Sequence, residues 1–284
     1  MKKYEKQWSS NEPGLMIFLI DQSGSMEVEW GDKNRAEQTS LVVNKVLENI
    51  ILTNMDGTKP KNRAYISLIG YGGNGGNTVD ILAKGLLSDI ADNPIDIQKV
   101  KVKKPDGGGG IIEIVEEKPV WVTPIANGLT PMGGAMDLAK DIIEKWIGKR
   151  ADAPAPIIIN ITDGMAYNGN ESNPMEEVEK TISVFKEIQS IKTSLDESPL
   201  VFNVHIGGDE KKIGFPENES ELGNDDMAKF LFEISSRVPD AIKEGANFSF
   251  SIKENSKAFI ANADLIDLIE FIEFGSKSAM QDKI

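Results

Sequence analysis

Residues 17–26 read IFLIDQSGSM, and this stretch decides the fold. Its first four residues are apolar, which is typical of a short strand buried on both faces of a sheet. Asp21, Ser23 and Ser25 then place side-chain oxygens at alternate positions of the following loop. Oxygen ligands from one loop suit a hard divalent cation such as Mg²⁺, which accepts neutral hydroxyls and keeps several waters. The stretch therefore predicts a metal-binding loop at the carboxyl end of a buried strand.

The composition excludes several classes of function. The 284 residues carry a net charge of −14, which argues against a nucleic-acid partner because phosphate contacts need a basic face. The absence of cysteine excludes disulfides and thiolate metal sites. With His205 as the single histidine, zinc sites built on two or three histidines are excluded as well.

The chain shows no membrane or export signal. Residues 1–13 are polar and lack the apolar core of a signal peptide. No stretch reaches the ~18 uninterrupted apolar residues of a membrane span. We therefore expect a cytoplasmic protein that does not insert into a membrane.

Apolar runs alternate with helical patterns, which favours an α/β fold with a doubly wound, mostly parallel sheet and helices on both faces. Strands are expected at residues 15–20, 64–71, 156–161, 200–206 and 248–252. Helices are expected at residues 35–53, 132–147, 174–191, 225–237 and 263–274. We expect a single domain over residues 14–280, after a polar segment at 1–13 and before a tail at 281–284.

An inserted β-hairpin is expected at about residues 95–122, where two alternating strands flank an Asp-Gly turn at Asp106. Its first strand is basic and its second is acidic, which suits cross-strand pairing. Because the hairpin precedes Thr130 in the chain, we expect its base near the rim of the metal site.

Two later segments complete the pattern of the opening stretch. They are Gly128-Leu129-Thr130-Pro131-Met132-Gly133 and Ile158-Ile159-Asn160-Ile161-Thr162-Asp163-Gly164. Ligands of an open parallel sheet bind at the carboxyl ends of its strands, and Asp163 follows an apolar strand while Thr130 precedes a helix. Each motif alone is also explained by a helix cap or an Asx turn. All three in this order favour a common site.

Together the three motifs resemble the von Willebrand factor A (vWA) family with its metal-ion-dependent adhesion site. The resemblance implies that Ser23, Ser25 and Thr130 give hydroxyl ligands to the metal. It implies that Asp21 and Asp163 act mostly through bound water or from behind these ligands. The metal would be Mg²⁺, with Mn²⁺ or Ca²⁺ as alternatives, and a partner protein would supply an Asp or Glu carboxylate to it.

The segment FIEFGSKS at residues 271–278 resembles the ending of bacterial cytoplasmic vWA proteins of the tellurium-resistance type. Such proteins are associated with serine/threonine kinase and phosphatase-like partners. The resemblance implies a protein–protein interaction module, an adaptor in a bacterial stress or signalling assembly.

The alternative is a metal-dependent phosphoesterase or another hydrolase that uses the same loop oxygens. It is disfavoured because the three motifs contain no histidine or lysine that could act as a general acid. They also offer only two carboxylates, fewer than a two-metal site normally needs. We therefore expect a binding module without catalytic residues rather than an enzyme.

Overall fold

The computed structural model describes residues 3–105, 107, 110–207, 211–243 and 250–280. A seven-stranded sheet lies at its centre, in the order β12 (Ile213–Gly214), β13 (Phe259–Ala263), β11 (Leu200–Ile206), β10 (Ile157–Thr162), β1 (Gly14–Asp21), β6 (Ala64–Tyr71), β7 (Val79–Leu86). The five inner strands pair in parallel, while the two edge strands, β12 and β7, pair antiparallel to their neighbours. The sheet is therefore mostly parallel, as predicted.

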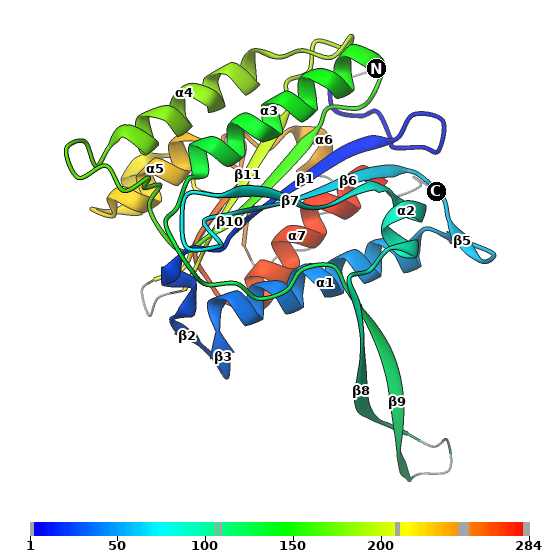
Figure 1. Cartoon of the computed structure of the whole chain (residues 1–284). Coiled ribbons are helices and arrows are strands. Elements are labelled where there is room, and N and C mark those ends of the chain that lie inside the picture. Colours follow the sequence, from blue (N-terminus) through cyan, green and yellow to red (C-terminus); the bar gives the residue numbers. More distant parts are fainter. Residues whose placement is uncertain (1–2, 106, 108–109, 208–210, 244–249, 281–284) are drawn as a thin grey trace.

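Helices cover both faces of this sheet (Figure 1). One face carries α3 (Met132–Lys149), α4 (Glu176–Ser190) and α5 (Asp226–Glu233). The other carries α1 (Arg35–Thr53), α2 (Leu87–Asp92) and α7 (Leu265–Met280). Short elements complete the description: η1 (Gly24–Glu27), β2 (Glu29–Trp30), β3 (Lys33–Asn34), β4 (Met55–Asp56), β5 (Lys59–Pro60), η2 (Glu219–Leu222) and α6 (Asp240–Lys243). The doubly wound α/β architecture expected from the sequence is confirmed.

Strand β1 lies at the middle of the core, and all of its residues are buried. Met16 and Phe18 point to the core shared with α1 and α7, whereas Leu15 and Ile17 point to the core shared with α3 and α4. Each fully buried side chain of this size contributes about 1.5–3 kcal/mol. Two-sided burial explains why the strand reads as a continuous apolar run.

Several predicted elements differ from the observed ones. No strand forms at residues 250–252 of the predicted strand 248–252, and β13 takes the place beside β11 instead. Helix α5 ends at Glu233, not at residue 237, because the chain turns back and the Ser236 N–H donates to Val201 O at 2.9 Å. Strand β7 was not predicted. Residues 248–249, Asp106 and the tail 281–284 lie outside the described residues.

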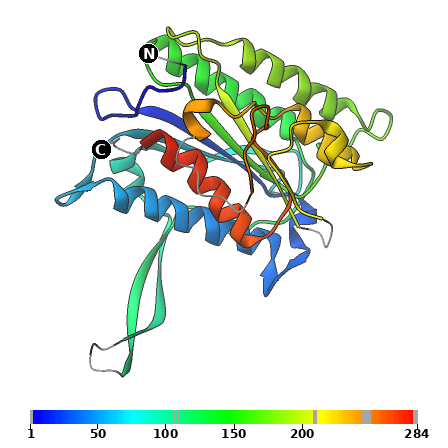
Figure 2. The same cartoon turned by 180° about the vertical axis from the view of Figure 1, so that it is seen from behind.

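The predicted hairpin is present as β8 (Asp96–Pro105) and β9 (Ile111–Val120), which project away from the layers as an arm (Figures 1 and 2). Its strands are joined by ion pairs such as Lys101–Glu113, at 2.8 Å. These pairs are solvent-exposed, so each adds at most about 1 kcal/mol.

The base of this arm is fixed to the middle of α1. The Asn44 side chain accepts the N–H groups of Trp121 and Val122, at 2.9 and 3.0 Å. The predicted metal-binding loop is met by the other end of this helix, where the N–H of its first residue, Arg35, donates to Val28 O just after η1. Asn44 lies nine residues beyond Arg35, which is about 13 Å along the helix. The expectation that the base lies at the rim of the metal site is therefore wrong.

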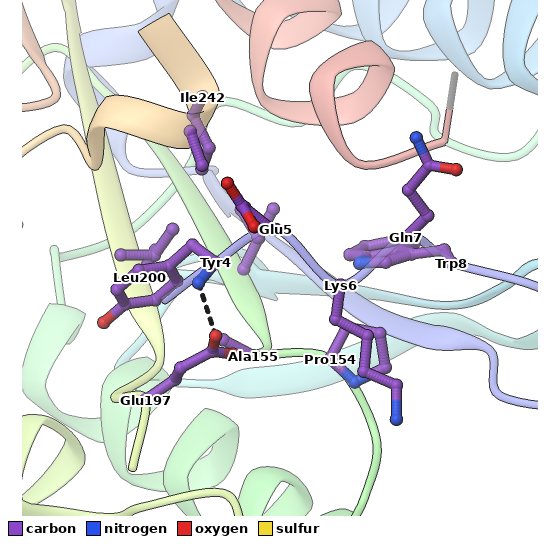
Figure 3. A pocket seen from close by; sticks show the side chains of 12 residues that line it. Tyr4, Glu5, Lys6, Gln7, Trp8, Pro154, Ala155, Glu197, Leu200 and Ile242 are labelled. Carbon is purple, nitrogen blue, oxygen red and sulfur yellow. Dashed lines mark hydrogen bonds between the residues drawn. The ribbon is translucent and has the colours of Figure 1, made fainter. Parts of the chain in front are cut away.

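A small cavity of about 40 Å³ lies under residues 4–8, beside the first residues of β10 and β11 (Figure 3). Glu197 lines it, 1% exposed, and accepts the backbone N–H of Tyr4. Its second oxygen has no hydrogen-bond partner within the described chain. A cavity of this size has room for one or two waters beside this oxygen. Among the described helices, none is both long and apolar enough to span a membrane.

Candidate functional site

The sheet brings the two predicted carboxylates to one edge. Asp21 is the last residue of β1, and Asp163 follows directly on β10. The two strands are parallel neighbours, with Ile20 opposite Ile161. Because parallel strands end at the same edge of a sheet, the two acids come together there.

The Asp21 carboxylate is 1% exposed and is held by two donors. The Ser23 N–H donates to Oδ1 at 2.8 Å, which shapes the loop as an Asx turn. The Thr162 hydroxyl donates to Oδ2 at 2.6 Å from the neighbouring strand. Thr162 was not predicted, although it immediately precedes Asp163 in the sequence.

The two serines lie between the acids. The Ser23 and Ser25 hydroxyls share a hydrogen bond, with their Oγ atoms 3.0 Å apart, and the Ser25 hydroxyl donates to Asp163 Oδ1 at 2.7 Å. Ser23 is 2% exposed, whereas Ser25 is exposed to solvent. The cluster therefore has a buried side at Asp21 and an open side at Ser25.

Thr130 lies on a third loop that is packed against the first. The Gly24 N–H donates to Gly128 O at 3.0 Å, and the Asn127 N–H donates to Gln22 O at 2.8 Å. Thr130 itself exchanges two backbone hydrogen bonds of 2.9 Å with Tyr167. The structure thus connects Asp21, Ser23, Ser25 and Asp163 by direct side-chain or turn contacts. It joins the loop of Thr130 to the Ser23 loop through Gly128 and Asn127 rather than through Thr130 itself.

Arg35 is a member of this cluster that sequence reasoning missed. Its Nη1 donates to Asp163 Oδ2 at 2.7 Å, in an ion pair whose side chains are 17% and 0% exposed. Arg35 is the first residue of α1, where a positive charge opposes the helix dipole. An arginine at a helix start was the available signal, because such a charge needs an acid to hold it.

The surroundings of Arg35 are tight. A Cβ on Gly207 would lie 2.6 Å from Arg35 Nε and Nη2, so only glycine allows this approach. The Arg35 Nε is buried and has no hydrogen-bond partner in the part of the chain that the structure describes. Leaving such a donor unpaired costs about 1–3 kcal/mol.

An open hollow of about 720 Å³ adjoins the cluster. Its lining includes Arg35 and Asp163, the polar residues His205 and Asn262, and the two acids Asp225 and Asp226. The His205 ring is 6% exposed, and its Nδ1 accepts the Asn262 N–H at 3.3 Å. Burial lowers the pKa of His205, so the ring is mainly neutral near pH 7.

The Asp21 carboxyl is electrostatically unfavourable without a cation. Burial and then the nearby charge of Asp163 raise its pKa from 3.8 to about 7, although the bonds from Thr162 and Ser23 oppose the rise. A cation placed between the two acids would remove this penalty.

A pH dependence of the metal-free protein follows. Between pH 3.8 and about 7, the folded protein keeps a proton on Asp21 that the unfolded chain releases. Stability in the presence of a chelator is therefore expected to fall as the pH rises through this window and to level off above it. Urea unfolding in EDTA at several pH values measures this, and Asp21→Asn should remove this component. An unchanged pH profile in the variant would contradict the assignment.

The oxygen donors fit a small octahedral cation. With metal–oxygen bonds of about 2.1 Å, adjacent ligands of an octahedron lie about 3.0 Å apart. The two serine Oγ atoms have this separation. Nowhere in the described residues do three or more His, Cys, Asp or Glu side chains gather to hold a metal. A metal at this edge would therefore depend on the hydroxyls.

Comparisons with known proteins bear on the fold. No protein-family model matches the chain, and no curated protein matches it significantly. Among solved structures, the chain is similar to the pilus adhesin SpaC from Lactobacillus rhamnosus GG, with a TM-score of 0.50 and 14% identity. The match covers 96% of this chain and 31% of that chain, so this chain spans about a third of SpaC.

Two further structures are matched at lower TM-scores. The vWF domain of the type V pili tip protein Mfa5 from Porphyromonas gingivalis is matched with a TM-score of 0.42 and 11% identity. The match covers 96% of this chain and 98% of that chain. Manganese-loaded TRAP from Plasmodium vivax gives 0.40 at 14% identity, over 92% and 72%. At 14% identity, the similarity to SpaC bears on the fold alone. With its mostly parallel sheet and two helical layers, the chain has a vWA/Rossmann-like α/β fold.

Proposed function

We propose that the cluster holds a divalent cation, Mg²⁺ with Mn²⁺ or Ca²⁺ as alternatives, and uses it to bind another protein. Ser23, Ser25 and Thr130 supply hydroxyl ligands, while Asp21 and Asp163 act through bound water or from behind the hydroxyls. The observation that carries the proposal is the 3.0 Å separation of the two serine Oγ atoms, next to two buried carboxylates.

The chemistry of these ligands favours an anionic partner. Neutral hydroxyls leave much of the charge on the ion, so an open coordination position attracts an anionic oxygen. Ser25 is exposed, which leaves that side of the cluster accessible. An Asp or Glu side chain of a partner protein fills the position and makes a short, directional bridge.

Binding is favoured over hydrolysis. His205, the single histidine of the sequence, lines the hollow but is buried and mainly neutral near pH 7. It is therefore poorly suited to protonate a leaving group. We therefore expect no turnover of p-nitrophenyl phosphate with Mg²⁺ or Mn²⁺. Steady turnover that Asp21→Ala abolishes would favour the hydrolase.

The cellular role that we propose is that of an adaptor in a bacterial stress or signalling assembly. The resemblance of residues 271–278 to the tellurium-resistance type supports this, with kinase or phosphatase-like proteins as partners.

Affinity capture tests the binding function. The full chain, immobilised, is exposed to an extract of its source organism in Mg²⁺ and, in parallel, in EDTA, and captured proteins are identified by mass spectrometry. Partners that depend on Mg²⁺ and are lost with an Asp21→Ala bait are the expected result. Capture that survives both EDTA and Asp21→Ala would defeat the metal bridge.

The β8–β9 arm is expected to help select the partner, since one ion bridge cannot distinguish between proteins. The arm exposes apolar side chains, including Ile111 at 73% and Val115 at 58%. Replacing Lys99 to Val115 by a short Gly-Ser turn should leave the stabilisation by Mg²⁺ unchanged but lose the captured partner. Equal capture by the shortened chain would show that the arm is not the specificity element.

A further inference from the structure

The role of Arg35 goes beyond the ligand set described above and rests on the proposed function. Its guanidinium donates a hydrogen bond to Oδ2 of Asp163, at 2.7 Å, and the Ser25 hydroxyl donates one to Oδ1. Both oxygens of this carboxylate are therefore engaged, and its charge is balanced by a residue of the chain itself. The Asp163 side chain is 0% exposed, so the ion pair is only weakly screened by solvent.

The charges of the loaded site follow from this pairing. Two carboxylates, Asp21 and Asp163, balance the two charges of a divalent cation. Within the cluster itself, Arg35 then leaves one positive charge in excess, and the nearest further acids are Asp225 and Asp226 across the hollow. Arginine keeps its charge at every relevant pH, so the excess is permanent.

The position of Arg35 is costly for the fold, which argues against a merely structural role. The residue stands at the start of α1, against the helix dipole, and its Nε is buried without a partner among the described residues. The hollow next to it is lined by Arg35 and Asp163 and also by Asp225 and Asp226. Arg35 and the exposed Ser25 bind the two oxygens of the same Asp163 carboxylate, so an anion bound at Ser25 lies one carboxylate away from the guanidinium.

We infer that Arg35 makes metal binding depend on the anionic ligand. By itself the guanidinium repels the cation and weakens its binding. When a carboxylate arrives, the same charge attracts it, so cation and carboxylate bind cooperatively. The site thus holds its metal loosely until an acidic partner is present.

The test measures Mn²⁺ binding by the electron paramagnetic resonance signal of free Mn²⁺, which needs no partner. Arg35→Gln keeps a donor for Asp163 but removes the charge, and it should bind Mn²⁺ about tenfold more tightly than the natural chain. Arg35→Lys keeps the charge and should bind Mn²⁺ as the natural chain does. Arg150→Gln is the matched control, because Arg150 stacks on Trp146 at the far end of α3.

A second arm compares sodium acetate with sodium chloride at equal ionic strength. Acetate should tighten Mn²⁺ binding severalfold in the natural chain, and clearly less in Arg35→Gln. If circular dichroism shows that Arg35→Gln is unfolded, Arg35→Met replaces it as the neutral variant, because methionine keeps most of the aliphatic part of the arginine side chain.

The outcomes separate the two proposals. A natural chain that binds no Mn²⁺, with or without acetate, overturns the proposed function and the role of Arg35 with it. Mn²⁺ binding that is equal or weaker in the neutral variants overturns the role of Arg35 alone. Tight binding by Arg35→Lys would do the same, because the charge would then not be the cause.

Discussion

Replacing Asp21 with asparagine is expected to abolish the stabilisation of the fold by Mg²⁺ and to stabilise the metal-free protein. In the natural chain, a ligand at ~100 times its dissociation constant adds roughly 2.7 kcal/mol to the free energy of unfolding. Asparagine removes one of the two negative charges of the proposed cation site. It also removes a buried carboxylate whose pKa is raised from 3.8 to about 7. In EDTA above pH 7, the charged form of this carboxylate destabilises the fold by a few kcal/mol, the free-energy equivalent of its pKa shift, and asparagine removes this cost.

Thermal melts in Mg²⁺ and in EDTA at about pH 8 measure both effects. The natural chain should melt a few degrees higher in Mg²⁺, whereas the variant should show one melting temperature in both buffers. Ser23→Ala and Thr130→Ala should likewise reduce the Mg²⁺ effect, because each removes one of the proposed hydroxyl ligands. Asp141→Asn on the solvent side of α3 is the matched control, since its side chain is 54% exposed. Identical melts of the natural chain in both buffers would count heavily against a bound metal.

The sequence predicts best the elements that have one dominant physical signal. Strand β1 is a continuous apolar run, because parallel strands are buried on both faces. Helix α1 spans residues 35–53 as predicted, and the Asn34–Glu37 capping box marks its start. The edge strand β7 has no such signal. Its residues VDILAKGL do not alternate regularly, and most of them are partly or fully exposed.

The last strand shows how a local pattern can mislead. Residues 248–252, FSFSI, alternate as a strand should, but the strand of the sheet is β13, with the sequence FIANA. Asn262 adopts a positive φ of 54° within it, which a propensity argument would place in a turn. Pairing with β11 decides the outcome, and a local pattern does not contain that information.

The same distinction holds for the candidate site. The proximity of Asp21 and Asp163 could be predicted from the sequence, because neighbouring parallel strands end at the same edge of the sheet. Arg35 could not, since its approach to Asp163 depends on the β2–β3 turn and on the space that Gly207 leaves. Contacts between a loop or helix start and a site residue, such as Arg35 with Asp163, depend on the path of the loops. Sequence periodicity does not describe that path.

The approach of the three loops also depends on one glycine, and Gly72→Ala is expected to disrupt both fold and site. Gly72 has a φ of +102°, which costs a residue with a side chain about 1–3 kcal/mol. A Cβ there would lie 2.3 Å from Leu129 O and 3.0 Å from Ser23 N. Relieving this overlap forces the Thr130 loop away from the Ser23 loop, at a further cost of about 1–3 kcal/mol.

Urea unfolding should therefore show a loss of roughly 2–6 kcal/mol for Gly72→Ala, the sum of these two costs. The stabilisation by Mg²⁺ should also fall sharply, because the proposed hydroxyl ligands of the two loops would then lie too far apart to bind one ion. Gly76→Ala is the matched control in the same turn, since a Cβ there meets nothing within 4 Å. It should change stability by less than about 0.5 kcal/mol, as surface substitutions usually do. If both variants keep the full Mg²⁺ effect, the Thr130 loop does not contribute to the metal site, and the ligands lie on the Ser23 loop and beside Asp163 alone.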